Sequence, residues 1–151
     1  MSHQTYAKTI IDNQRETKNK ALVLCGVEGR ITKVLFDSGS TQNVISEELF
    51  REIGGSRRFR IIRENKSLKC ANNSKLNCLG NVILQISIGN TICRKVFTIV
   101  EELSQKVIIG IRGMKASDVV IDTKKNGIFC KNEFLPFIGK LSPSTEIPEN
   151  I

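Results

Sequence analysis

Apolar and polar residues alternate along much of this chain, and a two-residue period is typical of β-strands with one buried face. The alternation is clearest in residues 81–88, where Val82, Leu84, Ile86 and Ile88 fall on one face. Other runs of apolar and β-branched residues have the lengths expected of strands. The strands predicted in this way cover residues 21–26, 30–36, 43–46, 59–62, 81–88, 91–100, 106–110, 119–122 and 127–130.

A single short helix is predicted over residues 46–53. Ser46 is a good N-cap, and Glu47 and Glu48 follow it at the positive end of the helix dipole. Gly54-Gly55 then provides a C-terminal stop. The strand-rich body is therefore expected to contain one short helix.

Turn-forming residues separate the predicted strands. Tight turns are expected at Glu28-Gly29, at Gly89-Asn90 and over residues 123–126. A longer polar hairpin is expected over residues 67–80, with Ala71-Asn72-Asn73-Ser74 at its tip. Hairpins in this number predict an all-β fold.

A chain of 151 residues is expected to form one domain with short tails. We place that domain at residues 21–138, after a polar N-terminal extension (1–20) and before a flexible C-terminal tail (139–151) that contains Pro143 and Pro148. Hydrophobic residues make up 40% of the chain and aromatic residues 5%, and Trp is absent. The core is therefore expected to consist mainly of Ile, Val and Leu.

The composition argues against several classes of protein. No apolar run reaches the roughly 20 residues of a membrane helix, and the N-terminus has no signal-peptide core, so no membrane partner is expected. Five cysteines without a CxxC pair, and a single His, argue against a disulfide framework, a zinc site and any other metal or cofactor. A reducing, cytoplasmic location fits best.

The cysteines themselves have two interpretations. Cys25, Cys93 and Cys130 are interpreted as small core hydrophobes. Cys70 and Cys78 flank the tip of the predicted hairpin, which leaves a redox link between them open.

The net charge of +8 is partly local. A basic stretch could bind nucleic acid or an acidic partner, or could be a solvated strand edge protected from pairing. Phe59 is the only aromatic residue among these charges, so no base-stacking platform is evident and nucleic-acid binding is not expected. The stretch is offset only by Glu64 and consists of Arg57, Arg58, Arg60, Arg63, Lys66 and Lys69.

The tripeptide Asp37-Ser38-Gly39 carries the chemistry of this sequence. It follows the apolar run 31–36, so its carboxylate is expected at a strand end, and the Gly allows backbone to approach it closely. An aspartic peptidase needs such a carboxylate facing an open cleft. Asp122-Thr123 is followed by Lys124 instead of Gly, so the tripeptide occurs once. A site with two carboxylates could therefore form only between two chains.

The order of these features resembles that of the retropepsin-like aspartic proteases. This family includes retroviral and LTR-retrotransposon proteases and their cellular relatives of the DNA-damage-inducible type. The resemblance covers roughly residues 21–138. It rests on Asp37-Ser38-Gly39-Ser40, on the apolar strand Val107-Ile108-Ile109-Gly110-Ile111, and on residues 120–128, which are similar to the last hairpin of the cellular and retrotransposon members.

The resemblance implies a closed β-barrel that works as an obligate homodimer. Asp37 would be the catalytic carboxylate, paired with Asp37 of a second chain. Ser38 would hydrogen-bond across the dimer, and Gly39 would shape the active-site loop and face the substrate. Ile109, Gly110 and Ile111 would pack behind that loop, and residues 128–137 would supply strands to the dimer interface.

The resemblance also implies a flap that closes over the bound peptide, formed by the hairpin at residues 69–78. The flap lacks the glycine-rich tip of the viral enzymes, and Arg112 stands near a position where many members carry an acidic residue. The flap residues expected to meet substrate are Cys70, Ala71, Asn72, Asn73 and Ser74.

The function expected from the resemblance is a homodimeric aspartic endopeptidase that cleaves extended peptides. The alternatives are a retropepsin-fold dimerisation module that no longer cuts and a nucleic-acid-binding β-domain in which Asp37 has no role. Ser40 stands where many viral enzymes have Ala. A hydroxyl there could donate to the ionised carboxylate, and we expect it to extend activity further into acid.

Overall fold

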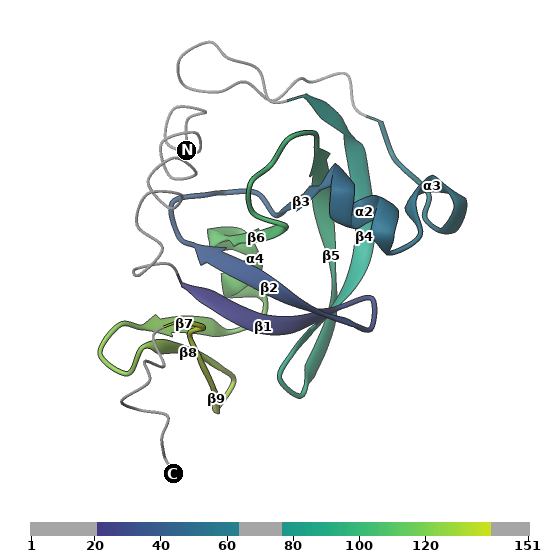
Figure 1. The fold of residues 1–151 in the computed structure, drawn as a ribbon. Helices are drawn as coiled ribbons and strands as arrows, with labels where there is room; N and C mark the ends of the chain where they lie inside the picture. Colours follow the sequence, from purple (N-terminus) through teal and green to yellow (C-terminus); the bar gives the residue numbers. More distant parts are fainter. Residues whose placement is uncertain (1–20, 64–76, 140–151) are drawn as a thin grey trace.

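A computed structural model gives the fold of residues 21–63 and 77–139. Six strands form a closed barrel in which the order is β1-β2-β6-β3-β5-β4 and β1 pairs with β4 (Figure 1). This confirms the all-β barrel expected from the sequence. The barrel strands are β1 (Leu22–Val27), β2 (Arg30–Asp37), β3 (Val44–Ser46), β4 (Cys78–Ile88), β5 (Thr91–Val100) and β6 (Val107–Gly110).

The barrel interior follows the alternation of the sequence. Val82, Leu84, Ile86 and Ile88 of β4 are all buried, as predicted, and they face Phe97 and its neighbours on β5. Complete burial of such side chains stabilises a fold by about 1.5–3 kcal/mol each. Cross-strand packing of aliphatic residues therefore supplies most of the core, with few aromatic rings.

A second, three-stranded sheet lies against the barrel and is seen at the lower left of Figure 1. Ile128 and Cys130 are buried in the same core as the barrel residues. The backbone N–H of Ile138 donates to the carbonyl of Leu22 at 2.7 Å, which ties the end of this sheet to the start of β1. The sheet consists of β7 (Val119–Asp122), β8 (Gly127–Cys130) and β9 (Glu133–Pro136).

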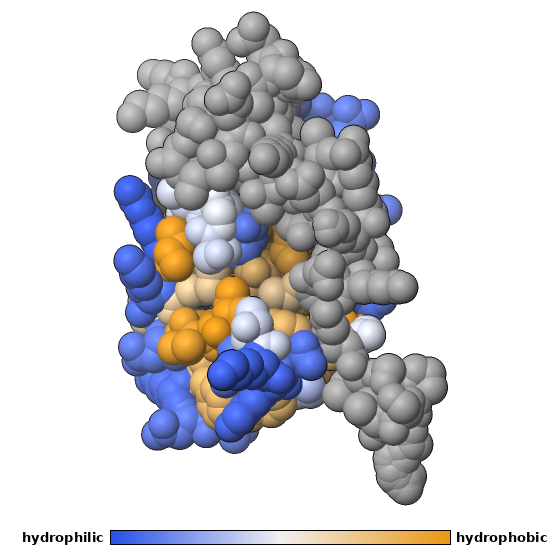
Figure 2. All heavy atoms as spheres, turned by 90° about the vertical axis from the view of Figure 1, so that its left-hand side faces the viewer, coloured by the Kyte–Doolittle hydropathy of each residue, from blue (hydrophilic) through white to orange (hydrophobic). Residues whose placement is uncertain are grey.

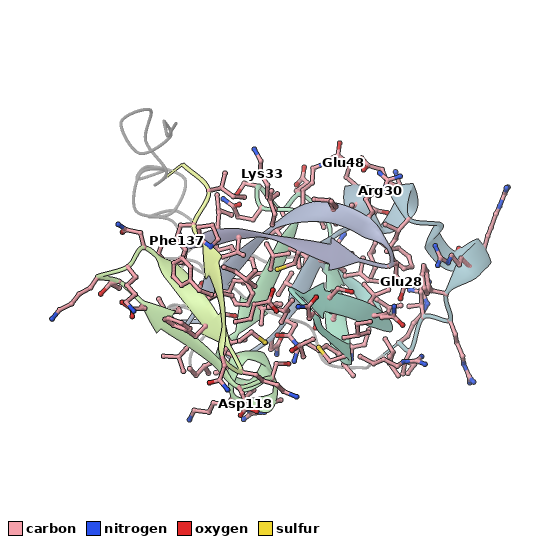
Figure 3. The ribbon with its side chains drawn as sticks, turned by 90° about the horizontal axis from the view of Figure 1, so that it is seen from below. Glu28, Arg30, Lys33, Glu48, Asp118 and Phe137 are labelled. Atoms are coloured by element: carbon pink, nitrogen blue, oxygen red, sulfur yellow. The ribbon has the colours of Figure 1, made fainter. Side chains whose placement is uncertain are left out.

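The predicted helix is confirmed as α2 (Glu47–Glu52). The side chain of Ser46 accepts a hydrogen bond from the backbone N–H of Leu49 at 3.1 Å, which is the expected N-cap. Leu49 and Phe50 bury the inner face of the helix. In Figure 3, which views the molecule from below, the labelled Arg30 lies near α2, at the opposite side from Phe137 and the second sheet.

The prediction of a single helix is wrong, because the described residues also form α3 (Gly55–Arg58) and α4 (Ile111–Ala116). Gly54 ends α2 with φ at 132°, and the chain then enters another helical turn directly. Arg58 closes this turn by donating to the carbonyl of Ile53 at 3.0 Å. None of the helices in the described ranges is long and apolar enough to cross a membrane.

The strand predicted over residues 59–62 is also wrong. Only Ile62 pairs, in an isolated bridge with Asn81 whose two backbone hydrogen bonds measure 2.8 and 2.7 Å. The bridge lies against Gly80, where a Cβ would stand 2.5 Å from the side chain of Ile61. This segment therefore approaches β4 at one point instead of extending the barrel.

The core interpretation of the cysteines fits their positions. Cys25 and Cys130 are buried, and Cys93 is half-buried. Burial, with the nearby thiols Cys130 and Cys93, raises the pKa of Cys25 to about 12. The Cys70–Cys78 link remains a prediction, because Cys70 lies outside the described residues.

Candidate active site

Asp37 is the last residue of β2, as the tripeptide predicts. Parallel pairing of β2 with β6 places it directly opposite Gly110. The side chain is buried, with 7% exposure, and its Oδ1 accepts a hydrogen bond from the backbone N–H of Gly39 at 2.9 Å. One carboxylate oxygen is thus fixed by the tripeptide that contains it.

The other oxygen, Oδ2 of Asp37, is buried and has no hydrogen-bond partner among the described residues. Buried polar atoms are nearly always paired in folded proteins, so an exception at a site residue calls for an explanation. Burial raises the pKa of Asp37, and the N–H of Gly39 opposes this effect only in part. The carboxyl group thus holds its proton to higher pH than an ordinary Asp.

The loop after Asp37 folds back on itself. The N–H of Ser40 donates to the carbonyl of Asp37 at 3.1 Å. The Ser40 hydroxyl is buried, donates to the carbonyl of Gln42 at 2.9 Å and accepts from the N–H of Gln42 at 3.3 Å. The expectation that Ser40 donates to the carboxylate is therefore wrong: its hydroxyl closes the loop instead.

The β6–α4 junction lies directly behind this loop. The N–H of Ile111 donates to the carbonyl of Ser40 at 2.7 Å. A Cβ on Gly110 would stand 2.6 Å from that same carbonyl oxygen and 2.7 Å from the carbonyl oxygen of Gln42, so only Gly fits there. Ile109 is completely buried beside them. The structure thus brings Ile109, Gly110 and Ile111 to the loop that carries Asp37.

The remaining predicted site residues divide into two groups. Ser38 is exposed and Gly39 is half-buried, so both are accessible at the open side of the loop. The flap residues Cys70, Ala71, Asn72, Asn73 and Ser74 lie outside the described residues. β4 begins at Cys78, which is half-buried and packs on a small cluster formed by Leu35, Val44, Val100 and Ile108.

No pattern in the sequence predicts a role for Asn43, yet this residue makes several contacts at the site. Its amide spans from β5 to the start of α4. The only signal in the sequence is a polar residue directly before the buried strand Val44-Ile45-Ser46. The same pattern also fits an ordinary loop residue.

The described residues contain no group of three His, Cys, Asp or Glu side chains arranged to hold a metal ion. The candidate reactive group of the site is the desolvated carboxyl group of Asp37, at the start of the loop that follows β2.

No family model matches this chain, and no curated protein matches it. Solved structures do match. The retroviral protease-like domain of Ddi1 from Leishmania major aligns with a TM-score of 0.68 at 18% identity, covering 80% of this chain and 95% of that domain. The EIAV protease, solved with the inhibitor HBY-793, aligns with a TM-score of 0.56 at 8% identity, covering 69% and 93%.

A retropepsin-like aspartic protease from Rickettsia conorii aligns with a TM-score of 0.53 at 15% identity, covering 69% of this chain and 77% of the other. At these identities the likeness concerns the fold. The chain has the retropepsin-like fold.

Proposed function

We propose that this chain is an aspartic endopeptidase that becomes active as a homodimer. The observation that carries the proposal is Oδ2 of Asp37, a buried acceptor without a partner in the described residues. A second carboxyl group at this position would supply the missing hydrogen bond by sharing its proton. The tripeptide Asp37-Ser38-Gly39 occurs once, so the second group would come from another copy of the chain.

Two carboxyl groups about 3 Å apart cannot both ionise, so the pair holds one proton. The ionised carboxylate takes a proton from a water molecule, which attacks the peptide carbonyl, while the protonated carboxyl donates to the developing oxyanion. The roles then reverse to protonate the leaving amine. The raised pKa of Asp37 favours this shared-proton state, because burial already disfavours its charge.

The surface beside the site supports association. Figure 2 shows the side of the molecule towards which β2 ends and on which the second sheet lies in Figure 1. Among the described residues on this face, apolar side chains gather in the middle, and strongly polar residues lie to their left and below them in this view. An exposed apolar patch is typical of a protein–protein interface. Substrate would lie extended above Asp37 as an added strand.

A dimerisation module without activity is the second candidate. Such a module would not need Asp37, and two buried carboxylates facing each other would oppose its assembly. The unpartnered oxygen of Asp37 therefore favours the enzyme.

Nucleic-acid binding by the basic stretch is a third candidate, and two of its described residues make contacts within the fold. Arg58 pairs with Glu28 at 3.1 Å, and Arg63 donates to the carbonyl of Leu79 at 2.8 Å. Two of its cations are thus already engaged within the fold.

The test is cleavage of a diverse peptide pool at mildly acidic pH and high protein concentration, with Asp37→Asn as the matched variant. Asn keeps the size of the side chain and an acceptor for the N–H of Gly39, but it cannot act as acid or base. Cuts made by the wild type and absent with the variant would establish the activity. A folded, dimeric wild type that makes no cuts would favour the assembly module.

A further inference from the structure

Asn43 connects the end of the candidate catalytic loop to two barrel strands. Its Nδ2 donates to the carbonyl of Val96 on β5 at 3.2 Å, and its Oδ1 accepts from the N–H of Gly110 at 3.1 Å. Its backbone carbonyl accepts from the N–H of Thr98 at 2.9 Å. One residue thus bonds to β5 twice and to the end of β6 once.

The third residue of α4 is shaped around this amide. A Cβ on Gly113 would stand 2.5 Å from Oδ1 of Asn43 and 3.0 Å from the side chain of Ile109. Glycine inside a helix costs about 1 kcal/mol relative to alanine, so its presence in a six-residue helix needs a reason. The close approach of the Asn43 amide provides that reason.

A buried lysine of β5 also contacts α4. Lys95 points inward from β5 with 7% exposure, and its Nζ donates to the carbonyl of Gly113 at 2.9 Å. Asn43 and Lys95 thus both lie against Gly113 of α4. The Asn43 amide occupies the space next to its Cα, and Lys95 bonds its carbonyl.

The held junction is the one that supports the catalytic loop. Gly110 receives the Asn43 amide on its N–H and lies opposite Asp37 in the β2–β6 pairing. The next residue, Ile111, donates to the carbonyl of Ser40. A change in the Asn43 amide would thus shift the backbone at Gly110 and Ile111. This backbone supports Asp37 at the start of the loop and Ser40 further along it.

We propose that Asn43 is a positioning residue for Asp37, acting by fixing the β6–α4 junction against the active-site loop, and that Gly113 provides the space its amide requires. As far as it concerns cleavage, this proposal rests on the proposed function. Asn43 does not itself touch the Asp37 carboxyl group in any contact described above.

The experiment uses the whole chain with Asn43→Ala, Asn43→Asp, Gly113→Ala and the double variant Asn43→Ala/Gly113→Ala. Asn90→Ala replaces an exposed asparagine in the turn between β4 and β5, outside the segment expected at the dimer interface, and is the matched control. Asn43→Asp keeps the acceptor for Gly110 and removes the donor to Val96, so it serves if Asn43→Ala does not fold. Each variant is compared by kcat and KM, measured on folded protein well above its dimerisation concentration.

We expect Asn43→Ala and Asn43→Asp to lower kcat by about 10–100-fold with KM changed by less than about threefold, because small misplacements of a catalytic group have effects of this size. Asn90→Ala should match the wild type. Gly113→Ala should also lower kcat, and its effect should shrink in the Asn43→Ala background, where the added methyl group has room. Unchanged kcat in folded Asn43 variants, or independent effects of the two substitutions, would overturn the proposal.

A readout without cleavage separates this proposal from the proposed function. The carbon-13 chemical shift of the Asp37 carboxyl and the amide shift of Gly39 should change in the Asn43 variants and stay constant in Asn90→Ala. If the wild type proves inactive, these shifts still decide the proposal: a change supports the positioning role, and constant shifts refute it.

Discussion

At the scale of single residues, Asp37 combines two properties that oppose each other. The carboxyl group is buried, and its Oδ2 has no partner in the part of the chain that the structure describes, which makes it a good site for a shared proton. The same burial destabilises the isolated fold once the group ionises. Function and stability are expected to conflict at this residue, as they often do at strained or desolvated sites.

This conflict predicts how stability depends on pH. Since the pKa of Asp37 is raised in the folded state, its contribution to stability is fully present below the unfolded pKa and is lost as the pH rises through the folded value. Unfolding by urea, at concentrations where the chain is monomeric, should therefore show Asp37→Asn gaining stability relative to the wild type between about pH 4 and pH 7. A constant difference across this range would contradict the raised pKa.

Ser40 leads to a second prediction at this scale. The Ser40 hydroxyl donates to the carbonyl of Gln42 and accepts from its N–H. Because both hydrogen bonds are lost, Ser40→Ala should lower the free energy of unfolding by about 1–3 kcal/mol. The acidic limb of the pH–rate profile should stay in place, since the hydroxyl does not reach the Asp37 carboxyl. A movement of that limb towards neutral pH would show that Ser40 acts on the carboxylate after all.

At the scale of elements, the predictions from sequence were most accurate for strands that alternate apolar and polar residues and bury one face. The β4–β5 hairpin and the β7–β8 hairpin agree with their predicted positions, because alternation and Gly- or Asn-containing turns determine strands locally. α4 was missed because Gly113 lowers its helix propensity, and tertiary contacts with Asn43 and Lys95 compensate for this.

The difference between local sequence patterns and tertiary contacts also explains which features of the site were predicted. The position of Asp37 at a strand end follows from the apolar run before it, which is local information. The partners of Ser40 and Asn43 depend on how the loop folds back and on contacts with Val96 and Gly110, which are distant in sequence. No pattern within the loop distinguishes these partners in advance.

The N-cap of α2 provides a test at this scale. Ser46→Ala removes the acceptor for the N–H of Leu49, and we expect a loss of about 1 kcal/mol in the free energy of unfolding. Ser56→Ala, in the exposed part of α3, is the matched control and should change stability by less than about 0.5 kcal/mol. Equal effects in thermal or urea unfolding would show that the cap does not stabilise α2.

At the scale of the whole molecule, barrel closure leaves the candidate site incomplete. Closure of the barrel by the β1–β4 pair removes open edges from its six strands and buries the core within one chain. The chain therefore has a core of its own, while one oxygen of its candidate catalytic group has no partner within residues 21–63 and 77–139. This combination is expected of a fold that is stable as a monomer and chemically competent only as a pair.

A mixing experiment tests this pairing directly. Wild-type chains and Asp37→Asn chains are equilibrated at equal amounts, well above the dimerisation concentration, with the total chain concentration held constant. If each active site needs Asp37 from both chains, only wild-type pairs cleave, and random pairing in a two-fold dimer leaves about one quarter of the activity. If each chain carried its own site, about one half would remain. Dilution of the wild type alone provides the matching control: specific activity should fall as the dimer dissociates, whereas a self-sufficient chain would keep it constant.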